Sequence, residues 1–422
     1  MLTNLSQEQA SVLQSISRGE NVFITGSAGT GKSYLLKVVK ENYNHLGLHV
    51  TASTGIAAVH IGGVTIHSWA GIGLGNAPVS EIINYINSGK ATLLRRKLRK
   101  ARMLAIDEIS MISAETFDLL NEVLQNIRGN NKAFGGIQLI ILGDFLQLPP
   151  IQNFETRTRQ YCFQSKAWEE ANFHTFYLQE IFRQKNSDFA ELLHRMRIGT
   201  LNEEDINILK TRVQLKRNSD IKPTIIVTHN KQVENINQQE LNKLNTSEVV
   251  YNIKGEGNEN KLNFLKKNCL AAEKLVLKEG AQVMMLKNTY QKEGIINGSI
   301  GVIKGFTEKR LPLVKFASGQ VKEIAAEEWI IEEFNNEKLA MEVKAKITQI
   351  PLMLAWAITV HKSQGMTLDE IECDLQAAFE EGQVYVAISR VKSLEGLYLK
   401  SFQSKFIKVN QEVVQFYEKL QV

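Results

Sequence analysis

The sequence predicts an α/β protein with parallel sheets. In the first half of the chain, short apolar runs rich in β-branched residues alternate with segments of helical periodicity. These runs are apolar throughout rather than alternately polar, which is typical of strands that are buried on both faces and joined by helical crossovers. The second half repeats the pattern more loosely. We therefore expect two α/β layers.

The predicted elements follow in order along the chain. Strands are expected at residues 21–25, 49–53, 103–107 and 138–142, with helices at 32–46 and 113–127. The second series of predicted strands lies at residues 224–229, 351–360 and 396–400. Near the C-terminus, the stretch VYVAISR, residues 384–390, resembles the end of a helix.

Two stretches interrupt this alternation. Residues 68–100 are first Gly-rich and then strongly basic, and we interpret them as an insertion between two core strands. Residues 280–348 alternate apolar and polar positions between Gly-containing turns, which predicts a small antiparallel barrel or sheet.

Composition narrows the class of protein. A chain of 422 residues is longer than one hydrophobic core usually organises, so at least two domains are expected. Its formal net charge of +5 is compatible with a polyanionic partner without requiring one. The three cysteines lie far apart without metal-binding spacing, and no secretory or membrane-spanning pattern is present. We expect reduced thiols and an unexported, cytoplasmic protein with no membrane partner.

The segment GSAGTGKS follows the first predicted strand and opens a helix. It matches the phosphate-binding loop pattern in the context that this pattern needs. The expected nucleotide-binding residues are Gly26, Ser27, Ala28, Gly29, Thr30, Gly31, Lys32 and Ser33. Glycines let backbone N–H groups surround phosphate oxygens, Lys32 reaches the β and γ phosphates, and Ser33 takes a Mg²⁺ position. The alternative is a chance Gly-rich turn.

Two adjacent carboxylates end the strand predicted at 103–107. Asp107 and Glu108 would cost desolvation energy there unless they meet a cation. Mg²⁺ held through Asp107 and a hydrolytic water activated by Glu108 explain both residues, whereas a solvated strand end is the alternative. Further on, GDFLQLPP places Asp144 and Gln147 after another core strand, where Gln147 either senses the γ-phosphate or is an ordinary loop residue.

Nine segments together resemble the motifs of Pif-type helicases of superfamily 1B, relatives of the RecD subunit. They are LSQEQASVL, GSAGTGKS, TASTGIAA, TIHSWAGIG, IDEISM, GDFLQLPP, EIFRQKNSDFAELLHRMRIG, AWAITVHKSQGMTLD and YVAISRVKSLEGLYL. They occur in the family's order between residues 5 and 399. The stretch from FRQ to RMRIG resembles the signature that separates Pif-type members from other phosphate-loop helicases. The length resembles compact bacterial members.

This resemblance implies an ATP- and Mg²⁺-dependent motor that moves 5′ to 3′ on single-stranded DNA and unwinds duplex, in genome maintenance. G-quadruplexes and RNA–DNA hybrids are substrates found in the family. Two RecA-like domains are implied, at residues 1–178 and 179–422. The first would carry the 68–100 insertion, and the second an SH3-like β domain at about 280–348. The implied partners are single-stranded DNA and single-strand/duplex junctions, bound by a monomer or a DNA-induced dimer, with a nucleoid-associated location.

The resemblance also assigns individual residues. Arg390, with Arg183 as its companion, would reach from the second domain to the γ-phosphate of ATP held by the first, where fixed guanidinium charges stabilise the transferring phosphoryl group. Gly365 joins the ATP-binding set. Gln9 would recognise the adenine edge, although Ser6 and Gln9 also fit a capping box, in which Gln9 only bonds back to the start of its helix.

The DNA contacts implied by the family motifs fall in both halves of the chain. They are Thr54, His67, His361, Lys362, Ser363 and Thr367. Hydroxyls and a lysine suit phosphate oxygens, and a histidine can stack on a base. The basic run between Arg95 and Arg102 is either a solvated helix face or a further DNA contact. Two other functions share these motifs: a translocase that separates strands poorly, and a binding module switched by nucleotide.

Overall fold

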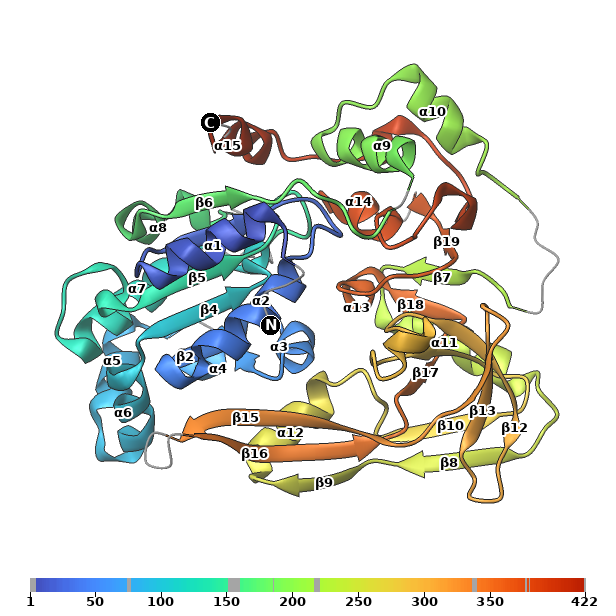
Figure 1. Ribbon diagram of the computed structural model, residues 1–422, viewed down its shortest axis with the longest axis horizontal. Helices are drawn as coiled ribbons and strands as arrows, with labels where there is room; N and C mark the ends of the chain where they lie inside the picture. Colours follow the sequence, from blue (N-terminus) through green and yellow to red (C-terminus); the bar gives the residue numbers. More distant parts are fainter. Residues whose placement is uncertain are drawn as a thin grey trace. The chain divides into compact units, whose positions relative to one another are not determined.

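The structure of this protein is a computed structural model, and each part of the chain is placed within one of two compact units. The described residues are 5–73, 77–150, 160–184, 186–215, 221–335, 340–375, 378 and 380–420, without the side chains of 333–335 and 340–341. Unit 1 comprises Met1–Phe182, Ile331–Lys344 and Gln415–Val422, and unit 2 comprises Arg183–Ile330 and Ala345–Val414. Each unit contains a parallel sheet (Figure 1), so the α/β prediction is confirmed.

Unit 1 is built on a six-stranded parallel sheet in the order β3-β2-β4-β5-β1-β6. The strands are β1 (Val22–Thr25), β2 (Leu48–Ala52), β3 (Val64–Thr65), β4 (Met103–Asp107), β5 (Gln138–Leu142) and β6 (His174–Tyr177). All residues of β1 and β4 are buried, as their continuous apolar runs predict. Since Ile24 pairs with Leu142 and Ile106 with Ile141, the carboxyl ends of β1, β5 and β4 meet at one edge.

Helices connect these strands and cover the sheet (Figure 1). They are α1 (Gln7–Ser17), α2 (Lys32–Tyr43), α3 (Gly55–His60), α4 (Ile66–Ala70), α5 (Val79–Asn87), α6 (Thr92–Lys100), α7 (Ala114–Arg128) and α8 (Lys166–Ala171). The long helix α7 begins with Ser113 capping the Thr116 N–H and ends at Gly129 in the left-handed conformation. One face of the sheet packs on α1 and α2 through a buried cluster that includes Val12, Ile16 and Leu35.

The basic run lies on and around α6, within the stretch predicted as an insertion. Some of its side chains are engaged in holding the fold: Arg95 donates to the Asn87 carbonyl and Arg99 to the Ile127 carbonyl. Lys97 donates to the Trp69 carbonyl and lies over the buried Trp69 ring. The run is therefore partly structural, which the charge pattern alone does not reveal.

The last residues of the chain belong to unit 1. Helix α15 (Gln411–Leu420) carries Phe416 and Tyr417, which lie in the Gln415–Val422 segment of that unit. The Phe416 ring stacks on Phe163 with a centroid distance of 4.1 Å and meets Phe145 edge-on at 5.6 Å. The chain thus leaves unit 1 at Phe182, returns to it for Ile331–Lys344, and returns again to complete the aromatic packing at Phe416.

Unit 2 contains a four-stranded parallel sheet in the order β18-β7-β19-β20. The strands are β7 (Thr224–Val227), β18 (Ala357–Thr359), β19 (Ile371–Cys373) and β20 (Leu397–Leu399). Helices of this unit are α9 (Ser187–Ile198), α10 (Glu203–Lys210), α11 (Asn230–Asn242), α12 (Glu259–Asn268), α13 (Val360–Ser363) and α14 (Gln383–Ile388). The predicted helix near residue 384 is confirmed as α14.

The prediction of a single strand at residues 351–360 is wrong. The run divides into β17 (Leu352–Leu354), which pairs antiparallel with β11 (Gln282–Met285), and β18, which pairs parallel with β7. Ala355 and the buried Trp356 lie between the two strands. Both halves are apolar because each is buried, although in different sheets, and an unbroken apolar run does not reveal where a chain changes sheet.

The remaining strands form the antiparallel part of the structure. A five-stranded sheet has the order β14-β13-β12-β11-β17, a three-stranded sheet β15-β16-β9, and β10 pairs with β8. The strands are β8 (Glu248–Asn252), β9 (Lys254–Gly257), β10 (Lys274–Lys278), β11 (Gln282–Met285), β12 (Ile300–Phe306), β13 (Pro312–Phe316), β14 (Val321–Glu323), β15 (Glu327–Asn335) and β16 (Ala340–Gln349). Antiparallel pairing therefore begins earlier than the expected residue 280, at Glu248.

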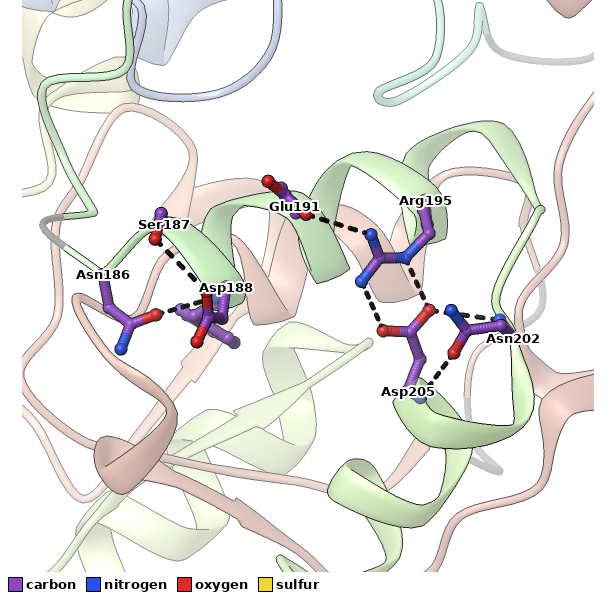
Figure 2. A network of polar contacts seen from close by, with 8 residues as sticks. Asn186, Ser187, Asp188, Glu191, Arg195, Asn202 and Asp205 are labelled. Carbon is purple, nitrogen blue, oxygen red and sulfur yellow. Dashed lines mark hydrogen bonds and ion pairs between the residues drawn. The ribbon is translucent and has the colours of Figure 1, made fainter.

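An ion pair between the half-buried Arg195 and the buried Asp205 joins α9 to α10 in unit 2. Figure 2 shows the Arg195 guanidinium against the Asp205 carboxylate, with Nε to Oδ2 and Nη2 to Oδ1 both 2.7 Å. Asp205 also accepts from the Asn202 N–H in a capping box that starts α10. Because Arg195 donates to it, the pKa of Asp205 is lowered below its usual value.

Replacing Asp205 by Asn is expected to lower the free energy of unfolding at pH 7 by about 1.5–3 kcal/mol, the range for hydrogen bonds to charged groups. The contribution of a carboxylate with a lowered pKa is complete above its unfolded pKa of about 3.9 and is lost as pH falls through the folded pKa. The difference between the two proteins should therefore shrink below about pH 4. Denaturant unfolding from pH 7 to pH 3 measures it.

Glu191→Gln is the matched control, because Glu191 pairs with the same Arg195 at 3.4 Å but its side chain is 70% exposed. Exposed pairs of this kind contribute about 0–1 kcal/mol. An equal loss in both variants would contradict the assignment of the stabilisation to Asp205.

Among the described residues, no helix combines the length and apolar character needed to cross a membrane. The three cysteines are free thiols, with Cys162 and Cys373 buried and Cys269 half-buried.

Candidate active site

The predicted phosphate loop joins β1 to α2 in unit 1. Gly31 is the N-cap of α2 and has a φ of +85°, a left-handed conformation that favours glycine. A Cβ at Gly26 would lie 2.5 Å from the carbonyl oxygen of Leu178, so that close approach also requires glycine. The loop thus brings Gly26, Ser27, Ala28, Gly29, Thr30, Gly31, Lys32 and Ser33 together at the start of a twelve-residue helix. The N–H groups at the start of a helix and the helix dipole favour an anion there.

The Lys32 ammonium lies against the loop. Its Nζ donates to the Gly26 carbonyl at 2.6 Å and to the Ser27 carbonyl at 2.9 Å. The Thr30 hydroxyl donates to the same Ser27 carbonyl at 3.0 Å. These bonds hold the loop in a compact curve and keep the lysine charge at its centre, where an anionic ligand would meet it.

Gln9 lies beside this loop from α1. The capping box predicted as the alternative is present: Gln9 N–H donates to the Ser6 hydroxyl, and the Ser6 N–H donates to Gln9 Oε1 at 3.2 Å. The same side chain turns its Nε2 toward Gly31, only 2.9 Å from where a Cβ of that glycine would be. The two readings of Gln9 are therefore compatible in geometry, and adenine recognition stays a prediction.

Asp107 ends β4 and is buried close to Lys32. Burial and, to a smaller extent, the neighbouring Glu108 charge raise the pKa of Asp107 to about 7, against the opposing effects of the Glu108 N–H and the Lys32 charge. Asp107 Oδ1 accepts from the Glu108 N–H at 3.0 Å. A carboxylate that is this costly to ionise without a cation is suited to binding one.

The donor set fits Mg²⁺ bound together with a phosphate. Among the described residues, no three His, Cys, Asp or Glu side chains gather closely enough to hold a metal by themselves. Mg²⁺ typically uses one or two protein oxygens and takes its other ligands from phosphate and water. Asp107 and the exposed Ser33, in the first turn of α2, supply oxygens of this kind.

Glu108 occupies an unusual backbone conformation. Its φ of +53° and ψ of +47° lie in the left-handed region, which costs a non-glycine residue about 1–3 kcal/mol. The neighbouring loop crowds it, because a Cβ at Gly143 would be 2.9 Å from the backbone nitrogen of Ile109. Glu108 directly follows β4, whose carboxyl end lies at the same edge of the sheet as that of β1, from which the phosphate loop starts.

Asp144 and Gln147 follow β5 at the same edge. Asp144 is fully buried, and Gln147 is 6% exposed. Gln147 Nε2 donates to Asp144 Oδ2 at 3.3 Å, and the Gln147 N–H donates to the Asp144 carbonyl at 2.9 Å. The Asp144 carboxylate thus fixes the orientation of the Gln147 amide, which the sequence analysis considered as a sensor of the γ-phosphate.

Unit 2 brings the two predicted arginines together. Arg183 Nη1 donates to the Ser389 carbonyl at 3.0 Å, and the buried Arg390 donates through Nε to the Val386 carbonyl at 3.0 Å. Burial and, to a smaller extent, the Arg390 charge lower the pKa of Arg183 to about 9. Both guanidinium groups remain protonated at pH 7 and concentrate positive charge, which favours a bound anion.

The predicted DNA contacts lie in separate units, and each is described within its own. In unit 1, Thr54 caps α3 by accepting from the Ala57 N–H, and His67 lies in α4 with a pKa lowered by burial. In unit 2, His361 and Lys362 are half-buried in α13. Thr367 follows that helix, as does Gly365 with a φ of +79°.

Ser363 differs from the other predicted DNA contacts. Its side chain is fully buried, and its hydroxyl donates to the Val360 carbonyl at 2.8 Å. A side chain enclosed in this way does not present its hydroxyl to a DNA phosphate. Only the backbone of Ser363 could therefore meet a DNA phosphate in this arrangement, and its predicted DNA contact stays a prediction.

Three residues near these groups have no place in the sequence-based predictions. Phe182 is 55% exposed, its N–H donates to the Gly29 carbonyl at 2.9 Å, and its ring lies against Gly31. Gln184 donates to the carbonyls of Ser389 and Val391, which fixes the backbone on both sides of Arg390. Tyr417 contacts Asp144 from α15. Phe182 and Gln184 flank Arg183 in the sequence, whereas nothing in the sequence pairs residue 417 with residue 144.

Comparisons with known proteins agree with these motifs. The model of the PIF1-like helicase family matches residues 4–207, and that of the 2B domain of DNA helicase Pif1 matches residues 261–306. The chain is 40% identical over 420 residues to the ATP-dependent DNA helicase PIF1 of Xenopus laevis, covering 99% of this chain and 64% of that protein. It thus spans less than two thirds of that relative's length.

Solved structures extend the similarity to the whole chain. The Pif1 helicase of Candida albicans is 36% identical, with a TM-score of 0.74 and coverage of 99% of this chain and 100% of that one. Pif1 from Bacteroides sp. is 29% identical over 99% of this chain and 97% of that one, with TM-scores of 0.87 in complex with ADP-AlF4 and 0.66 when bound to single-stranded DNA. Two RecA-like domains are the architecture of this group. The chain therefore belongs to the PIF1-like helicase family.

Proposed function

We propose that this protein is an ATP-dependent DNA helicase. The observation that carries the proposal is the edge of the unit 1 sheet, where the phosphate loop, the buried Asp107 and the strained Glu108 occur together. Loop N–H groups and Lys32 would bind the ATP phosphates, Ser33 and Asp107 would hold Mg²⁺, and Glu108 would take a proton from the attacking water. When bound, Mg²⁺ would neutralise developing charge on the phosphates.

The remaining residues of the candidate active site have proposed roles in binding or hydrolysing ATP. Gln147 would respond to the γ-phosphate, and Gln9 and Gly365 would contact the nucleotide. Arg183 and Arg390, the paired charges of unit 2, would stabilise the transferring phosphoryl group. The Bacteroides relative binds ADP-AlF4, which supports a nucleotide role for these residues.

We further propose that the protein moves 5′ to 3′ on single-stranded DNA. The residues that would contact the strand are Thr54, His67, His361, Lys362, Ser363 and Thr367. Ser363 would do so through its backbone, and His67, whose pKa is lowered by burial, is suited to stacking on a base. The Bacteroides relative binds single-stranded DNA, which supports this partner. We also propose that the protein acts on single-strand/duplex junctions, G-quadruplexes and RNA–DNA hybrids. It would work as a monomer or a DNA-induced dimer and would be associated with the nucleoid.

The proposed domain division follows the family pattern. Domain 1 would run from residue 1 to 178, with the insertion at 68–100, and domain 2 from 179 to 422, with the SH3-like part at about 280–348. The second segment of unit 1, Ile331–Lys344, and its C-terminal segment fall outside this simple division. Limited proteolysis would locate the cleavable boundaries.

Unwinding of one duplex that carries either a 5′ or a 3′ single-stranded tail tests the function. We expect ATP-dependent unwinding from the 5′ tail alone, together with ATP hydrolysis that single-stranded DNA stimulates. Stimulated hydrolysis with no unwinding from either tail would favour a translocase or a nucleotide switch, and a 3′ preference would refute the polarity.

A further inference from the structure

The hydroxyl of Tyr417 lies where the first residues after β5 meet the last residue of β1. Tyr417 comes from α15 and is 5% exposed. Its hydroxyl lies 2.8 Å from the Thr25 hydroxyl, accepts the Phe145 N–H at 3.0 Å and donates to Asp144 Oδ1 at 3.4 Å. All these residues belong to unit 1.

These contacts connect both loops of the candidate site. Thr25 immediately precedes Gly26, the first residue of the phosphate loop. Asp144 accepts from the Leu146 N–H at 3.2 Å and from Gln147 Nε2 at 3.3 Å. A phenol has one proton and two lone pairs, so donation to Asp144 leaves the oxygen to accept from Thr25 and Phe145. One hydroxyl therefore sets the position of both loops.

The surroundings hold the Tyr417 ring in place. The adjacent Phe416 stacks on Phe163, and Phe416 also meets Phe145, the residue that follows Asp144. Thr25 and Asp144 are fully buried, so water does not readily replace a lost partner. A fixed donor beside a buried carboxylate determines which rotamer that carboxylate adopts, and Asp144 in turn determines where the Gln147 amide points.

We propose that Tyr417 is a positioning residue for ATP hydrolysis. It acts through Asp144 on Gln147, and it links α15 to the group that responds to the γ-phosphate. The inference rests on the proposed function. Since Tyr417 would not contact ATP, its loss should affect the rate of the chemical step rather than the binding of the nucleotide.

The test uses Tyr417→Phe, which keeps the ring and removes only the hydroxyl. We expect kcat of the DNA-stimulated ATPase to fall about tenfold, less than the ~100-fold that a 1 Å misplacement of catalytic groups can cost. KM for ATP should change little. In a Gln147→Ala background, Tyr417→Phe should cause no further loss, because the group through which it acts is already gone.

Phe416→Leu is the matched control. It weakens the packing of α15 but keeps all the groups that form hydrogen bonds with the Tyr417 hydroxyl. We therefore expect a lower thermal midpoint, whereas kcat measured well below that midpoint should be retained. If Tyr417→Phe lowered kcat by the same factor in the wild type and in the Gln147→Ala background, the inference would be overturned. An unchanged kcat of Tyr417→Phe would also overturn it. A wild-type protein without DNA-stimulated ATPase would instead refute the proposed function, and the inference with it.

Discussion

Replacing Glu108 by Gln is expected to reduce DNA-stimulated ATP turnover by about 10²–10⁴-fold, the contribution of a positioned general base. Gln keeps the size of the side chain but cannot take a proton from water. Binding of ATP should remain, because the phosphate loop and Lys32 are unchanged. Fluorescent-nucleotide binding together with a steady-state ATPase assay measures both quantities.

Glu115→Gln provides the control for Glu108, since it makes the same chemical change at an exposed position in the first turn of α7. It should leave turnover unaltered. The thermal midpoint of Glu108→Gln should not fall below that of the wild type, because the backbone conformation is unchanged and the charge repulsion with Asp107 is removed. Near-normal turnover of Glu108→Gln would exclude Glu108 as the base.

Arg390→Ala is the second change with a large expected effect. A guanidinium that stabilises the transferring phosphoryl group contributes roughly 10³-fold or more to the rate. We expect DNA-stimulated hydrolysis to fall by about this factor, while single-strand binding without nucleotide stays close to that of the wild type. Fluorescence anisotropy of a labelled strand, measured at one fixed salt concentration, gives the binding.

Two further variants separate charge from structure at this position. Arg390→Lys keeps a positive charge but loses the planar group, and it should recover only part of the rate. Arg212→Ala also removes an arginine that donates to carbonyls of unit 2, those of Leu397 and Glu395, and should retain most of the activity. If Arg390→Ala instead abolished DNA binding and left residual turnover normal, Arg390 would be a DNA-binding or structural residue.

The local part of this site could be predicted from the sequence. A phosphate loop is a contiguous stretch, and Gly26 to Ser33 contain all its chemistry within eight residues. Asp107 and Glu108 could be found because a buried strand that ends in two carboxylates is unusual. The apolar runs likewise located β1, β4 and β5, since their burial on both faces removes polar residues from them.

What the sequence did not reveal depends on contacts distant along the chain or on changes of sheet. Tyr417 and Thr25 are 392 residues apart, and neither belongs to a motif that names the other. The division between β17 and β18 falls inside one apolar run, where both halves are equally hydrophobic. The burial of Ser363 could not be predicted either, because the sequence does not show whether a serine hydroxyl faces solvent or donates to a carbonyl of its own helix.

The discontinuity of unit 1 has a consequence for how the protein is made. A ribosome releases the chain from its N-terminus, so Phe163 and Asp144 emerge long before Phe416 and Tyr417 exist. The aromatic cluster of unit 1 remains incomplete until Phe416 has been translated, and the candidate site acquires the hydroxyl contacts of Tyr417 only after that residue has been added. A nascent fragment ending at Phe182 would therefore present apolar rings to chaperones before it could bind nucleotide in its final arrangement.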